Sequence, residues 1–72
     1  MTLLADLAMG GKARVKRVVG ADGISLRLLE MGLTPGAEVV LVGAAPLGDP
    51  LEFEVRGYRL SLRRLEAARI EI

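Results

Sequence analysis

The side chains capable of catalysis in this sequence are few and scattered. The 72-residue chain contains no histidine and no cysteine, the two side chains that most often act as base or nucleophile near neutral pH. Ser25 and Ser61 have no base close to them in the sequence, so each is interpreted as an ordinary residue on a helix or strand face. We therefore expect no catalytic residue and no enzymatic activity.

Carboxylates could bind a hard cation, but they occur singly along the chain. Glu52 and Glu54 share the outer face of one predicted strand and could in principle hold Mg²⁺. A solvated strand face explains these two glutamates better. Because soft ligands are absent, any transition-metal site would use carboxylates, backbone carbonyls and water, and would be weak and unselective. We predict no metal site and no cofactor, and a domain that senses a weakly bound divalent cation stays open as an alternative.

Basic residues gather in two places, which are Lys12, Arg14, Lys16 and Arg17, and then Arg59, Arg63 and Arg64. The net charge of +1 does not steer the chain strongly toward nucleic acid or an acidic membrane surface. Phe53 and Tyr58, the only aromatics, alternate toward the predicted core, so no base-stacking platform is expected. The turn at 20–23 resembles an anion cradle only weakly, because Asp22 would repel a phosphate. We expect no nucleic-acid partner, and a basic RNA-binding barrel is the least favoured alternative.

The elements that must position these side chains are mainly short strands. Alternation of apolar and polar residues predicts strands at 13–19, 37–42, 51–55, 58–62 and 68–72. The alternation slips at Lys16-Arg17 in the first strand, which predicts a β-bulge. Short helical turns are expected at 3–8 and 63–67.

The strands 51–55 and 58–62 are separated only by Arg56-Gly57, which predicts a two-residue hairpin with positive φ at Gly57. In the expected register Val55 opposes Tyr58, Phe53 opposes Leu60 and Leu51 opposes Leu62, all on the buried face. On the wet face, Glu54 is expected to pair with Arg59.

The stretch Leu28–Gly36 predicts a joint between a helix and a strand. Gly32 suits the left-handed position after a helix, and Leu33 would then fold back onto Leu28 in a Schellman ending. Pro35-Gly36 follow as the middle residues of a type II turn. The helix before this joint is expected at 23–31, with Asp22 as its N-cap.

The apolar residues of this helix occupy two sides. Ile24, Leu28 and Met31 form a stripe that should face the core, whereas Leu26 and Leu29 lie roughly opposite. In one interpretation another segment covers the helix and both sides are buried. We favour this interpretation because single exposed leucines are common and do not by themselves indicate a partner. In the other, Leu26 and Leu29 form a patch that faces a partner.

Five short strands and one helix in so short a chain favour a strongly bent sheet closed into a small barrel, with the helix at one end. This predicts a mainly β, single domain spanning 1–72. A constrained loop rich in proline and glycine is expected at 43–50. With catalysis set aside, the candidate partner-binding residues are Leu26, Leu29, Pro46, Leu47 and Asp49.

No run of apolar residues approaches the length needed to span a bilayer, and 2–8 is too short and too acidic for a signal peptide. We therefore expect a cytoplasmic protein that is not itself embedded in a membrane. The surplus of apolar side chains on the helix and at Ala44-Ala45 is compatible with weak self-association.

Three blocks, Leu28–Gly36, Ala45–Pro50 and Gly57–Ala67, resemble the FeoA family in order and spacing. The likeness covers nearly the whole chain from Leu3 onward, with Met31 where the family often has leucine. It carries over no settled active site, because the matched positions are makers of turns: Gly32, Pro35, Gly36, Pro46, Gly48, Pro50 and Gly57.

The resemblance implies an SH3-like barrel and a role in bacterial ferrous iron uptake. FeoA proteins are small cytoplasmic partners of FeoB, a membrane transporter with a GTPase domain, and the same domain occurs at the C-terminus of DtxR-type repressors. The function implied is an accessory protein that binds the cytoplasmic part of FeoB and performs no reaction itself.

Overall fold

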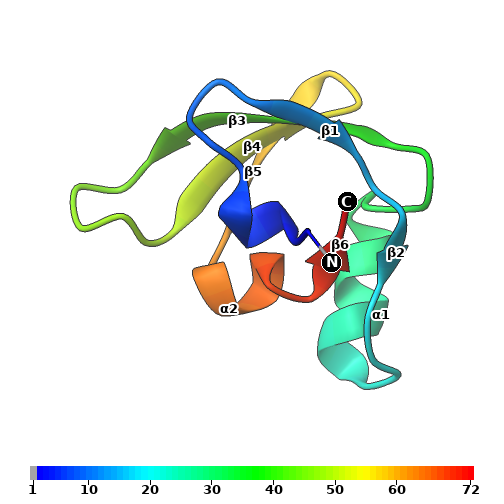
Figure 1. Cartoon of the computed structure of the whole chain (residues 1–72). Helices are drawn as coiled ribbons and strands as arrows, with labels where there is room; N and C mark the ends of the chain where they lie inside the picture. The colour runs from blue at the N-terminus through cyan, green and yellow to red at the C-terminus, as the bar shows by residue number, and fades with distance from the viewer. Residues whose placement is uncertain (1) are drawn as a thin grey trace.

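The computed structural model describes residues 2–72 and contains six short strands in two sheets (Figure 1). The elements in chain order are the 3₁₀ turn η1 (Leu4–Asp6), β1 (Lys12–Arg14), β2 (Arg17–Val18), α1 (Gly23–Glu30), β3 (Glu38–Ala44), β4 (Leu51–Val55), β5 (Tyr58–Leu62), the single-turn helix α2 (Arg64–Ala67) and β6 (Ile70–Glu71). One sheet has the order β1-β3-β4-β5 and the other pairs β2 with β6, with all neighbours antiparallel. The fold is therefore mainly β with one helix of more than a single turn, as predicted.

The sixth strand arises because the predicted first strand is divided between the two sheets. The Val15 N–H donates to the carbonyl of Ala37 at 2.9 Å, whereas the next residue, Lys16, donates to Glu71 at 2.7 Å. The bulge predicted at Lys16-Arg17 is thus wrong, since the chain there leaves one sheet and enters the other. An irregularity of register occurs instead in β3, between Leu41 and Gly43.

The β4–β5 hairpin has the predicted register, from Val55 opposite Tyr58 to Leu51 opposite Leu62. Both loop residues adopt positive φ, 52° at Arg56 and 84° at Gly57, as a type I′ turn requires. Phe53 is fully buried at the centre of the sheet.

Two details of the hairpin differ from the prediction. Tyr58 is 45% exposed, because its hydroxyl reaches out of the sheet to the carbonyl of Met31 at the end of α1. Glu54 does oppose Arg59, yet the two form none of the three ion pairs found within residues 2–72. The wet face of the hairpin is therefore solvated at this position.

The joint between α1 and β3 forms as the sequence predicts. Gly32 has φ +100°, its N–H donates to Leu29 O at 3.0 Å, and Leu33 N–H donates to Leu28 O at 3.2 Å, which is the Schellman pattern. Gly36 has φ +89°, and Ala37 N–H closes the type II turn onto the Thr34 carbonyl at 3.0 Å. Helix α1 is consequently held at a fixed angle to β3.

Helix α1 is rotated relative to the predicted orientation. Leu28 is fully buried, but Ile24 is 41% exposed and Ser25 is buried in its place. The Ser25 hydroxyl donates to Val19 O at 2.8 Å and accepts from Arg69 Nη1 at 3.3 Å. Because these bonds satisfy a buried hydroxyl, the helix can turn this side inward and leave Ile24 at the surface.

The buried side chains form a single aliphatic cluster around Phe53. The four-stranded sheet curves over this cluster, while η1 and α2 lie beneath it and α1 lies at one end beside β2 (Figure 1). Within residues 2–72, no backbone hydrogen bond joins the outer edge of β1 or β5 to another segment. The bent barrel is confirmed, but β1 and β5 remain as unpaired edge strands in the described part of the chain, so the four-stranded sheet does not close on itself.

Candidate partner-binding surface

A shallow, largely apolar hollow lies beside the N-terminal half of α1. It measures about 360 Å³ and is lined by residues 20–23 together with Ser25, Leu26 and Leu29. Leu26 is 58% exposed, whereas Leu29 is half-buried at the wall of the hollow. The interpretation in which both sides of the helix are buried is therefore wrong for Leu26. We call this feature the helix hollow.

The rim of the helix hollow carries the Asp22 carboxylate, which is paired with the Arg69 guanidinium. The Asp22 carboxylate caps α1 by accepting from Ser25 N–H at 3.1 Å, and Arg69 Nη1 donates to the same oxygen at 2.7 Å. These two bonds, the Ser25 N–H first, lower the pKa of Asp22 from 3.8 to about 2. The predicted N-cap is confirmed, and its carboxylate remains charged at any physiological pH.

The other predicted site residues lie in the loop between β3 and β4. Leu47 is 97% exposed at its tip, and Pro46 is also exposed. The Asp49 carboxylate accepts from the backbone N–H of Arg64 at 3.0 Å, and Arg64 Nε donates to Gly48 O at 2.6 Å. Asp49 thus helps to fix the loop against α2, which presents Leu47 on a rigid support.

The helix hollow and this loop do not form one surface. Figure 1 shows α1 and the β3–β4 loop at opposite ends of the molecule. The five predicted residues therefore divide into two separate candidate surfaces, one with Leu26 and Leu29 and one around Leu47.

A second hollow, between α1 and α2, was not predicted. It is lined by Ile24, Arg27, Arg63, Leu65 and Glu66, and Leu65 is 82% exposed. Arg27 and Glu66 form an ion pair that ties the two helices together. The sequence does indicate that Leu65 is exposed, because it is a single apolar residue between the cations at 63–64 and Glu66.

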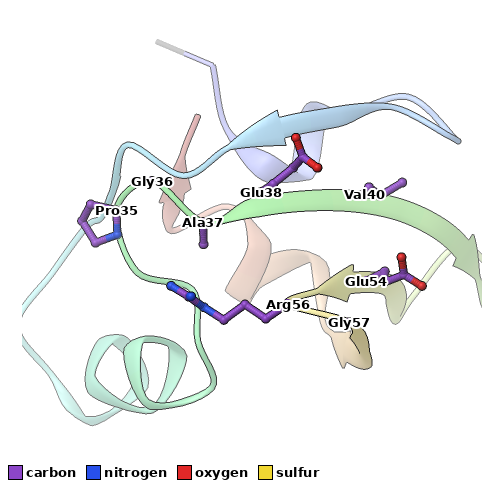
Figure 2. Close-up of a pocket in the computed structure, with 8 residues that line it drawn as sticks. All are labelled: Pro35, Gly36, Ala37, Glu38, Val40, Glu54, Arg56 and Gly57. Carbon is purple, nitrogen blue, oxygen red and sulfur yellow. The ribbon is translucent and has the colours of Figure 1, made fainter.

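A third hollow, about 460 Å³, lies on the outer face of β3 and β4 (Figure 2). Glu38 and Glu54 project from the sheet on this side, while Arg56 extends away from them toward the turn at Pro35 (Figure 2). Arg56 is already engaged, because Nη2 donates to Thr34 Oγ1 at 2.7 Å and Nε donates to the Gly32 carbonyl at 3.3 Å. Residues 2–72 hold no cluster of three acidic side chains that could bind a metal ion.

A family model described as the FeoA domain matches residues 2–72. The chain belongs to the FeoA domain family. A curated relative, the "Fe(2+) transport protein A/Fe(2+) transporter FeoB fusion protein" of Porphyromonas gingivalis, is 41% identical over 69 residues. That match covers 96% of this chain but only 8% of the fusion protein.

Solved structures of FeoA proteins share the fold. The solution structure of iron(II) transport protein A from Clostridium thermocellum gives a TM-score of 0.90 at 37% identity, covering 97% of this chain and 43% of that one. The crystal structure of Stenotrophomonas maltophilia FeoA complexed with zinc, described as a procaryotic SH3 domain protein, gives 0.87 at 35% identity. It is matched over 99% of this chain and 88% of that one.

The SH3-like fold extends beyond transport proteins. The manganese regulator SloR matches 96% of this chain with 32% of its own length, at a TM-score of 0.79 and 22% identity. This likeness concerns the fold alone.

FeoA-domain proteins belong to ferrous iron transport. Within residues 2–72 of this chain, no helix has the length and hydrophobicity to cross a membrane.

Proposed function

We propose that this chain is a cytoplasmic accessory protein of ferrous iron uptake that binds the cytoplasmic part of an FeoB-type transporter. The observation that carries the proposal is the Porphyromonas gingivalis relative, in which an FeoA-type domain and an FeoB-type transporter share one polypeptide. Covalent linkage keeps the two parts together at a high effective concentration, which suits a domain that acts by contact. The scattered carboxylates and the absence of histidine and cysteine favour a binding role over a catalytic one.

The helix hollow is the surface we assign to this contact. Leu26 is an exposed apolar side chain beside a concave wall, so a partner side chain seated there would remove apolar area from water on both sides. Full burial of one leucine stabilises a complex by up to about 2 kcal/mol, enough to change affinity by more than tenfold. The rigid loop with Pro46, Leu47 and Asp49 is proposed as a second, independent contact.

The test compares the intact protein with a Leu26→Asp/Leu29→Asp double variant in calorimetric titration against the purified cytoplasmic domain of the cognate FeoB. We expect the double variant to lose binding, because it places two carboxylates in an apolar contact. Leu65→Asp is the control, since it introduces a carboxylate at an exposed leucine of α2 outside the helix hollow.

The outcomes separate the surface from the partner. Intact protein that shows no binding even at high micromolar concentration contradicts the proposed function. Binding that persists in the double variant but fails in Leu65→Asp moves the contact to the hollow between α1 and α2. Circular dichroism of each variant verifies that it is folded before the titration is interpreted.

A response to a divalent cation is a second candidate function, favoured by the zinc complex of the Stenotrophomonas maltophilia protein. In this chain Glu38 and Glu54 border the hollow in Figure 2, and Glu52 lies on the same face of β4 as Glu54. Calorimetric titration with Fe²⁺ or Mn²⁺ tests this candidate, and the absence of heat in the intact protein would eliminate it. Binding that weakens in Glu54→Gln would support it.

A further inference from the structure

Strand β5 is an unsealed edge of the four-stranded sheet. It lies at the end of the order β1-β3-β4-β5, and within residues 2–72 no backbone hydrogen bond links its outer side to another segment. It is five residues long and contains no proline. Edge strands of this kind pair readily with another strand unless charge, shortness or a bulge prevents it.

The hairpin register identifies the backbone groups that face outward. The residues that flank a two-residue hairpin loop form a hydrogen-bonded pair, and such pairs alternate along the strands. Tyr58, Leu60 and Leu62 therefore direct their N–H and C=O groups toward β4, where they oppose Val55, Phe53 and Leu51. The N–H and C=O groups of Arg59 and Ser61 point to the free edge, and both residues are exposed.

We propose that a second copy of this chain pairs with this edge, β5 against β5 and antiparallel, with the two-fold axis at Leu60. In this register Arg59 faces Ser61 of the other copy, and each such pair exchanges two N–H···O=C bonds, which uses all four outward groups of each copy. Leu60 meets its own counterpart on the inner face, where it is half-buried in the monomer. The product is one continuous eight-stranded sheet.

The charges on the outer face fit this register. Along one row of the sheet Lys12, Val40, Glu54 and Arg59 are neighbours, and along the next row Glu52 opposes Ser61. When Arg59 pairs with Ser61 of the second copy, Glu52 of that copy lies in the same row of the sheet, on the strand after Ser61. Each Arg59 then lies between Glu54 of its own chain and Glu52 of the other, with the small Ser61 leaving room for the side chain. The two Arg59 side chains are diagonal neighbours across the two-fold axis, and the four carboxylates of Glu52 and Glu54 from both copies offset their repulsion.

The opposite edge is a poorer partner for β5. Strand β1 has only three residues, and Lys12 and Arg14 are both exposed on the same outer face. A β1–β5 contact between copies would place these cations beside Arg59, which is unfavourable. It would also be a head-to-tail contact that does not close, so the symmetric β5–β5 pair is the arrangement we infer. Its small size puts it among weak interfaces, formed only at high protein concentration.

The first test is sedimentation velocity of the full chain from micromolar to millimolar concentration, with the Ser61→Pro variant alongside. Proline removes the Ser61 N–H, which bonds nothing inside the hairpin, and edge strands accept proline at such outward positions. We expect the intact protein to shift toward a dimer and Ser61→Pro to remain a monomer at every concentration. Ser61→Thr, which keeps the N–H and suits a strand, is the matched control and should dimerise.

The second test uses charge and does not depend on the folding of the proline variant. Arg59→Glu alone sets the introduced carboxylate against Glu52 of the other copy, so this variant should not dimerise by itself. Glu52→Arg alone sets the introduced guanidinium against Arg59 of the other copy and should likewise stay monomeric. An equimolar mixture of the two variants restores both attractive contacts in a heterodimer, and its sedimentation should shift toward the dimer.

Three results overturn the proposal. One is an intact protein that remains monomeric at millimolar concentration. Another is a dimer that persists in folded Ser61→Pro and in each single charge variant. The third is a mixture of the charge variants that stays monomeric while the intact protein dimerises. Loss of FeoB binding in the helix-hollow variants has no bearing on this edge, so the two proposals fail separately.

Discussion

The hydroxyl of Tyr58 donates a hydrogen bond to the backbone carbonyl of Met31, which joins the start of β5 to the C-terminal end of α1. Arg56 acts in parallel by donating to the adjacent carbonyl of Gly32. Carbonyls at a helix C-terminus lack intrahelical partners and carry partial negative charge, so a hydroxyl and a guanidinium are favourable there. The β4–β5 hairpin therefore fixes the C-terminal end of α1, and the helix hollow lies beside the N-terminal half of the same helix.

Removing the Tyr58 hydroxyl tests this attachment. Tyr58→Phe retains the ring and deletes the donor, so we expect the free energy of unfolding to fall by about 1 kcal/mol. Urea unfolding followed by circular dichroism would show a lower midpoint with an unchanged slope. A midpoint equal to that of the intact protein would mean that water replaces the hydroxyl at no cost and that Arg56 alone fixes the helix end.

Local signals account for the parts of the fold that the sequence predicted well. The Schellman ending at Gly32, the turn at Pro35-Gly36 and the hairpin at Arg56-Gly57 each depend on a few adjacent residues whose φ preferences are intrinsic. Strict alternation in 51–55 then determined the register, because a slip by one residue would expose Phe53.

The features that the sequence did not reveal depend on residues far apart along the chain. The rotation of α1 follows from the bonds of Ser25 to Val19 and to Arg69, and a helical wheel contains neither partner. The exposure of Tyr58 likewise follows from an acceptor at Met31, which is 27 residues away. Periodicity reports which side chains are apolar, but the side that is buried is decided by such long-range partners.

The candidate site shows the same division. Leu26 and Leu29 could be identified as surplus apolar residues, but their exposure depended on whether another segment covers α1. Asp49 looked like a surface acid available to a partner, whereas its carboxylate accepts the backbone N–H of Arg64, 15 residues away. The sequence therefore indicated which residue types a candidate surface would offer, but not which of them are exposed and free of other bonds.

Alanine substitutions at three glycines separate backbone strain from steric clash. Gly32→Ala combines φ +100° with a Cβ only 2.7 Å from the Tyr58 hydroxyl oxygen, so we expect a loss above about 2 kcal/mol. Gly36→Ala has φ +89° but open space, and should lose only about 1–2 kcal/mol. Gly23→Ala, with neither problem, is the control and should be neutral or slightly stabilising in urea unfolding. Equal losses at Gly32 and Gly36 would show that the contact with Tyr58 relaxes freely.

Acid should weaken the fold partly through Asp22. Its pKa falls from 3.8 to about 2 because Ser25 N–H and then Arg69 favour the charged carboxylate. A lowered pKa in the folded state means that this stability is present above about pH 4 and is lost as the pH falls toward about 2. Asp22→Asn keeps an acceptor for the cap but cannot titrate. The difference in thermal midpoint between the intact protein and this variant should therefore shrink across that window, and a constant difference would contradict the assignment.

The rigidity of the β3–β4 loop should depend on one side chain of α2. Arg64→Ala removes the bond from Nε to Gly48 O, but keeps the backbone N–H that Asp49 accepts. We expect amide exchange at Ala45 and Gly48, whose N–H groups bond within the loop, to accelerate on the order of tenfold as local opening becomes easier. Arg63→Ala removes a neighbouring exposed cation and is the control, because no hydrogen bond of its guanidinium is found within residues 2–72. Exchange that accelerates equally in both variants would assign the effect to charge, and unchanged exchange in Arg64→Ala would mean that the loop is held by its own prolines and turns.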